Sequence, residues 1–167
     1  MLSHRKFVEY LLVGLVLSRQ AETNNTQASV RRTLTVTVHQ SSGFDNISLA
    51  HLQRMLAGSL LHWPDSSRVI LAEQAEESYT QQLTLQMVLK LTPAVYKRQL
   101  LELQFQGKEL PTIKVLNSDE NAVKFVGNVP GALAVVDASA ISHPAFSRVK
   151  VLKLDGLLPG QKGYRLQ

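Results

Sequence analysis

The sequence predicts a three-layer α/β fold in which a mainly parallel sheet carries helices on both faces. Short apolar, β-branched segments alternate along the chain with amphipathic helical segments. That alternation is typical of parallel strands joined by crossover helices. The composition, 44% hydrophobic and 19% charged residues, is that of a folded globular chain, and 167 residues suit one domain.

The first half of the chain supplies two strands around one helix. Residues 32–38 (RTLTVTV) alternate in the manner of a strand. Ser48 then caps a helix over residues 49–57, and Gly58 ends it. After a turn at Trp63-Pro64-Asp65, residues 68–72 (RVILA) read as a short, buried strand of a parallel sheet.

Two helices follow that strand. Residues 76–91 are helical in pattern, and their apolar side consists of Leu83, Met87 and Leu91. Thr92-Pro93 places a cap and a first-turn proline before a second helix over residues 94–105. The apolar side expected for this second helix consists of Leu100, Leu101 and Phe105.

The remaining elements continue the alternation. Residues 112–116 (TIKVL) predict a strand, and Asn117-Ser118-Asp119-Glu120 begins a helix that runs to about Val126. Residues 132–136 (ALAVV) and 148–154 (RVKVLKL) predict the last two strands. The domain therefore spans residues 32–157, followed by a C-terminal tail over residues 158–167.

The first 21 residues have the order of a secretory signal peptide. Two cations precede the apolar run from Leu11 to Leu17, and Ala21 is a small residue at a possible cleavage point. Ala28 is an alternative cleavage point, and an ordinary amphipathic first helix is the alternative structure. Residues 22–31 then form a polar leader to the domain.

Catalytic, cofactor and metal motifs are absent from the sequence. There is no cysteine, and the five histidines form no metal-binding spacing. No nucleophile elbow, P-loop or GxGxxG occurs, so we expect neither an enzyme nor a bound cofactor. The basic residues are scattered, and we expect no nucleic-acid partner. The apolar run in the first 21 residues is too short for a transmembrane span, and we expect none in the mature chain.

Open α/β sheets bind ligands beyond the carboxyl ends of their strands. Polar loops follow the first strand and the second strand, and Asp137–Ser139 follow the fourth. His39 adjoins the first of these loops, as a cleft residue or as an ordinary loop histidine. The candidate ligand-binding residues are Gln40, Ser41, Ser42, Gly43, Ser78 and Thr80.

Several ordered segments resemble the periplasmic phosphate-binding proteins of ABC transporters, as a short member with a single lobe. The resemblance includes a helix ending in Ala57-Gly58 before Trp63-Pro64-Asp65, and Phe105, Gly107 and Pro111 in an F-x-G-x-x-x-P segment. It continues with Val129-Pro130-Gly131-Ala132 entering a strand and with the final strand, residues 149–156. It implies one lobe of a type II periplasmic binding protein.

The resemblance also implies a function. It implies a non-catalytic periplasmic domain that binds phosphate or another small polar solute or anion for a transporter or sensor in the envelope. Phosphate-binding members carry an arginine and a Ser-Gly-Thr loop where this chain has residues 73–80, with three carboxylates that would repel an anion. The alternative is an interaction or assembly module that keeps the lobe fold without its ligand site. A small enzyme with a convergent catalytic set is the third possibility.

Overall fold

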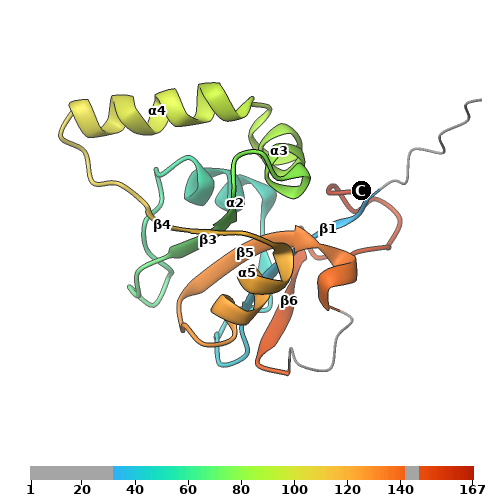
Figure 1. Cartoon of the computed structure of the whole chain (residues 1–167). Helices are drawn as coiled ribbons and strands as arrows, with labels where there is room; N and C mark the ends of the chain where they lie inside the picture. The colour runs from blue at the N-terminus through green and yellow to red at the C-terminus, as the bar shows by residue number, and fades with distance from the viewer. Residues whose placement is uncertain (1–31, 142–146) are drawn as a thin grey trace, which may run out of the picture. The chain divides into compact units, whose positions relative to one another are not determined.

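The computed structural model describes residues 32–141 and 147–167, and they form a lobe built on a mixed sheet (Figure 1). Its strand order is β2-β6-β1-β5-β3-β4. The strands are β1 (Leu34–His39), β2 (Asn46–Ile47), β3 (Ile70–Gln74), β4 (Thr112–Leu116), β5 (Ala132–Asp137) and β6 (Val149–Leu154). The pairing of β1 with both β5 and β6 is antiparallel, and every other pairing is parallel. The predicted α/β fold with a mainly parallel sheet is confirmed.

Strand β1 lies in the interior of the sheet and runs against its neighbours. Leu34 pairs with Asp137 and Val38 pairs with Leu133, so β1 ends where β5 begins. Five of its six residues are buried, because helices cover both faces of the sheet. The buried hydroxyl of Thr37 donates to the carbonyl oxygen of Ala134 at 3.3 Å.

One face of the sheet packs against α2 (Leu49–Leu56), α3 (Tyr79–Thr84) and the π-helical turn η1 (Leu85–Leu89). Ser48 caps α2 as predicted, since its Oγ accepts from the amide of His51. The single helix expected over residues 76–91 is instead α3 followed by η1. The wider π turn rotates the chain, and Leu85 and Val88 become its most buried side chains.

The other face packs against α5 (Asp119–Val126). Ser118 caps this helix by accepting from the amide of Asn121, and Asp119 and Glu120 lie in its first turn, as the sequence predicts. The helix buries Ala122, Val123 and Val126 completely. They meet a sheet surface of small side chains, which lets the helix lie close, made of Ala72, Ala132, Ala134 and Val136. The 3-10 turn η2 (Ala138–Ile141) adds to this face.

Helix α4 (Pro93–Phe105) projects from the lobe on the side of α2 and α3, away from α5 (Figure 1). Its predicted start is confirmed, with Thr92 as the cap and Pro93 in the first turn. Its expected apolar side is wrong. Phe105 is 88% exposed and Leu101 is 45% exposed, and Tyr96 is the buried residue of the helix.

The C-terminal residues 158–167 are packed into the lobe. Tyr164 and Leu166 are buried in the core on the α2 side of the sheet. The carbonyl oxygen of Leu166 accepts from the amide of Leu34 at 2.8 Å, which places the end of the chain beside the start of β1. Residues 158–167, which we expected to be a C-terminal tail outside the domain, therefore contribute to the core of the lobe.

The predicted signal peptide and leader, residues 1–21 and 22–31, lie outside the described residues, as does His143. In the part of the chain that the structure describes, no helix has the length and hydropathy needed to cross a membrane.

Candidate functional site

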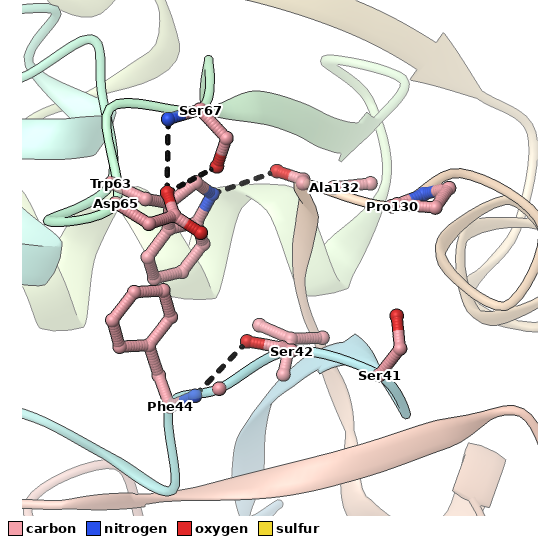
Figure 2. A pocket seen from close by; sticks show the side chains of 11 residues that line it. Ser41, Ser42, Phe44, Trp63, Asp65, Ser67, Pro130 and Ala132 are labelled. Atoms are coloured by element: carbon pink, nitrogen blue, oxygen red, sulfur yellow. Dashed lines mark hydrogen bonds between the residues drawn. The ribbon is translucent and has the colours of Figure 1, made fainter.

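A small pocket opens where β1 ends and β5 begins (Figure 2). Its volume is about 220 Å³, which suits a small solute. It is lined by Val38, Ser41, Ser42, Gly43, Phe44, Trp63, Asp65, Ser67, Pro130, Gly131 and Ala132. Because hydroxyl groups contribute much of its polar lining, we call it the hydroxyl pocket.

The loop after β1 supplies two of the serines. The amide of Ser41 donates to Nδ1 of His39 at 3.1 Å, so this ring nitrogen is an acceptor. The hydroxyl of Ser41 lies 2.7 Å from the same nitrogen, and this hydrogen bond fixes its place in the loop. The hydroxyl of Ser42 accepts from the amide of Phe44 at 3.3 Å, which leaves its proton free to donate.

The opposite wall is a turn before β3 (Figure 2). One carboxylate oxygen of Asp65, Oδ1, accepts from the amide of Ser67 at 2.9 Å and from its hydroxyl at 2.6 Å. These hydrogen bonds lower the pKa of Asp65, so the carboxylate is charged at neutral pH. The pocket therefore carries a negative charge, and the hydroxyl of Ser67 also faces a ligand as an acceptor.

Two aromatic rings hold the walls in place. Trp63 stacks on Phe44 with ring centroids 5.1 Å apart, which joins the turn before β3 to the loop after β1. The indole nitrogen of Trp63 donates to the carbonyl oxygen of Gly131 at 2.9 Å. Gly131 has φ +86°, and a Cβ there would lie 2.9 Å from the carbonyl oxygen of Arg68, so this close approach requires glycine. Trp63 thus anchors the turn before β3 to the loop after β1 and to the start of β5.

The six predicted ligand-binding residues do not form one site. Ser41, Ser42 and Gly43 line the hydroxyl pocket, and Gln40 adjoins them without lining it. Ser78 and Thr80 follow the C-terminal end of β3. This end of the strands is opposite to the one where β1 ends and the hydroxyl pocket lies. The expectation that all carboxyl ends share one edge is wrong for β1, because this strand is antiparallel to β5.

The opposite edge uses its polar side chains for structure. The hydroxyl of Thr80, which is 5% exposed, donates to Oδ2 of Asp119 at 2.9 Å and thereby ties α3 to α5. The same oxygen accepts from the amide of Asp137 at 3.1 Å. Arg32 lies 3.7 Å from the carboxylate of Asp137. Ser78 precedes α3, and its side chain makes no capping hydrogen bond there.

A second cavity, of about 380 Å³, lies between α4 and the β3–β4 edge of the sheet, and we call it the α4 cavity. Glu73 lines it and is 8% exposed. The hydroxyl of Tyr96 lies 2.7 Å from Oε1 of Glu73, and the amide of Gln81 donates to Oε2 at 3.1 Å. Burial raises the pKa of Glu73, although both hydrogen bonds act in the opposite direction.

Sequence reasoning missed Asp65 and Ser67 as pocket residues and Glu73 as a buried carboxylate. For Asp65 and Ser67, the signal in the sequence was the turn at Trp63-Pro64-Asp65. Such a pattern predicts a turn but does not predict that the turn lines a pocket. Glu73 follows an apolar strand segment without a break, and only the packing of α4 over it explains its burial. Among the described residues, no three histidine or carboxylate side chains are grouped so that they could hold a metal ion.

The fold is that of one lobe of a periplasmic binding protein. In particular, it matches substrate-binding proteins of the phosphate ABC transporter type. PstS from Borrelia burgdorferi matches with a TM-score of 0.65 at 11% identity, over 81% of this chain and 54% of that one. An ABC-type phosphate transport receptor from Vibrio cholerae matches with a TM-score of 0.60 at 14% identity, over 77% and 48%.

A putative phosphate ABC transporter substrate-binding protein from Clostridium perfringens, solved with bound phosphate, matches with a TM-score of 0.58 at 12% identity, over 76% of this chain and 46% of that one. The chain therefore spans about half the length of these proteins, as a single lobe does. No protein-family model matches the sequence. No curated protein matches it either.

Proposed function

We propose that this chain is a non-catalytic solute-binding lobe of the bacterial envelope and that it holds a small polar solute in the hydroxyl pocket. The observation that carries the proposal is the hydrogen-bonding character of that pocket. Asp65 and the hydroxyl of Ser67 face a ligand as acceptors, and the hydroxyl of Ser42 can donate. Such a set suits a solute that brings several donors of its own, such as a polyol or a monosaccharide.

Phosphate is the anion to test, because the similar solved structures include a phosphate transport receptor and a protein solved with bound phosphate. The hydroxyl pocket is poorly suited to it. Phosphate oxygens are mainly acceptors, and the ionised carboxylate of Asp65 would repel them. No lysine or arginine lines this pocket to offset that charge, within the ranges that the structure describes. We therefore expect neutral hydroxylated solutes to bind more tightly than phosphate.

Isothermal titration tests this function. The protein is titrated with phosphate, sulfate, small carboxylates, glycerol and a set of monosaccharides at millimolar concentration. We expect heat from a hydroxylated solute, and about tenfold weaker binding in Asp65→Asn, because the solute then donates to a neutral acceptor and no longer to a charged one. Ser78→Ala is the matched control, since Ser78 lies at the opposite edge of the sheet. Absence of heat from every solute would reject the solute-binding function.

A second function, docking to a protein partner, is favoured by a different observation. Helix α4 and edge strand β4 expose Leu101, Phe105 and Val115, three large apolar side chains. Pull-down from envelope extracts with wild-type protein and with a Leu101→Ser/Phe105→Ser variant tests it. Loss of the same partner in the variant supports docking. Retention of that partner by the variant contradicts docking through this surface.

We also propose that the chain is delivered to the periplasm. This proposal rests on the first 21 residues, in which basic residues precede an apolar run as in a secretory signal peptide. Expression of the full chain in a bacterium, followed by fractionation and intact-mass measurement, tests it. We expect a periplasmic product shortened after Ala21 or Ala28. A full-length cytoplasmic product would contradict the signal peptide.

A further inference from the structure

The α4 cavity differs in character from the hydroxyl pocket. Its volume, about 380 Å³, is large enough for a small organic molecule. Most of its wall is apolar and comes from η1, α4 and β4, through Leu85, Pro93, Tyr96, Leu100, Ile113 and Val115. A ligand that fits this cavity therefore has an apolar body.

Among the polar side chains that line this cavity, Glu73 is a buried carboxylate. A carboxylate accepts about four hydrogen bonds, and Tyr96 and Gln81 account for two of them on Glu73. No lysine or arginine within the described ranges forms an ion pair with Glu73. Buried carboxylates are costly without a cationic or donor partner, so the remaining acceptor positions favour a ligand that carries a cation.

The hydroxyl of Tyr96 points to the same conclusion. It has one proton and two neighbouring acceptors, Oε1 of Glu73 at 2.7 Å and the carbonyl oxygen of Leu56 at 3.1 Å. When Glu73 carries a proton, it can donate to Tyr96 while Tyr96 donates to Leu56, and all three groups are satisfied. The raised pKa of Glu73 agrees with this arrangement. A bound cation would replace the proton on Glu73.

Charged side chains at the mouth of the cavity also favour a cationic ligand. Glu76 and Glu77 line it together with Lys97, and Lys97 lies 4.0 Å from the carboxylate of Glu76. Two carboxylates against one ammonium group leave a negative potential, which attracts cations and disfavours anions.

We propose that the α4 cavity is a binding site for a small organic ammonium ion, with the ammonium group hydrogen-bonded to Glu73 and the alkyl chain against Leu100 and Ile113. The site is separate from the hydroxyl pocket, and its occupancy does not depend on whether a solute binds there.

Three four-carbon probes of similar size test the inference on the full chain: n-butylammonium, n-butanol and butyrate. In isothermal titration at neutral pH we expect n-butylammonium to bind about tenfold or more tightly than n-butanol, and butyrate to give no heat. Glu73→Gln should reduce n-butylammonium affinity by about tenfold and leave n-butanol unchanged. Glu102→Gln is the matched control and should change neither, because it removes an exposed carboxylate of α4 that does not line the cavity.

Equal affinity for n-butylammonium and n-butanol, or unchanged n-butylammonium binding by a folded Glu73→Gln variant, would overturn the proposal. Methyl NMR of the wild-type protein decides the question if that variant does not fold. Shifts of the Leu85, Leu100 and Ile113 methyl signals on addition of n-butylammonium support the site. Shifts confined to residues around Phe44 and Trp63, or no shifts, reject it.

Discussion

Helices α5 and α4 begin in the same way and lie in different environments. Ser118 caps α5 by accepting from the amide of Asn121, and Thr92 caps α4 by accepting from the amide of Val95. Helix α5 then buries three residues completely, whereas the longer helix α4 buries only Tyr96. The difference lies in what each helix meets, since α5 meets a sheet surface of alanine and valine and α4 borders a cavity.

The comparison separates two uses of a helix in this lobe. Burial of α5 contributes to the stability of the fold, because its apolar side chains leave water completely. Helix α4 contributes little apolar burial and instead supplies Tyr96, Lys97 and Leu100 to the wall and mouth of the α4 cavity. Substitutions in α5 should therefore change stability, and substitutions in α4 should change mainly binding.

The largest effect is expected from Val123→Ala in α5. Val123 is fully buried, and its truncation leaves a cavity between the helix and the sheet. We expect a loss of about 2–3 kcal/mol in the free energy of unfolding, measured by urea denaturation. Val115→Ala is the matched control, because Val115 is 58% exposed. A similar loss in both variants would show that α5 is no more important to stability than the edge strand.

A smaller effect is expected from pH acting on Glu73. The folded-state pKa is raised above the ordinary value of 4.5, so between these two values the folded state binds more protons than the unfolded state. The contribution of Glu73 is present below pH 4.5 and is lost as the pH rises through the raised pKa.

Urea unfolding of wild-type protein and Glu73→Gln across this range measures that contribution. We expect the stability of the wild type to fall relative to the variant as pH rises. The pKa values of Asp45 and Asp65 are lowered, and their contributions have the opposite sign but are common to both proteins. Parallel pH profiles would show that Glu73 is not destabilised by its burial.

The smallest effect is expected from Phe105→Ser at the end of α4. Because Phe105 is 88% exposed, we expect a change of less than about 0.5 kcal/mol in the free energy of unfolding. Thermal and urea denaturation measure it. A loss comparable to that of Val123→Ala would show that α4 packs on the lobe in solution more fully than its contacts indicate.

Much of the fold could be predicted from the sequence. Hydrophobic periodicity and turn residues predicted the bounds of β4 as the structure has them. They predicted those of α2, α4, α5 and β5 to within one or two residues. The direction of β1 could not be predicted, because an alternating strand pattern is the same in either direction. The burial of Tyr164 and Leu166 was also missed, since the polar, glycine-rich segment around them shows no periodicity.

The site was less predictable than the fold, because its position depends on the direction of β1. Ser41, Ser42 and Gly43 were correctly placed in a loop after the first strand, but the edge of the sheet at which that loop lies depends on the direction of β1. The apolar side expected for α4 failed because a helical pattern identifies which residues share a face. It does not identify whether another element covers that face.

The antiparallel direction of β1 has a further consequence for the covalent chain. It places Leu34, at the start of β1, beside the end of β5. There the amide of Leu34 donates a hydrogen bond to the carbonyl oxygen of Leu166. The described lobe thus receives the chain and releases it at neighbouring points. A short linker between these points and new termini in the exposed segment at Gly107-Lys108-Glu109 would give a circular permutant with every strand pairing intact. The same adjacency lets the lobe be inserted into a surface loop of another protein without pulling its sheet apart.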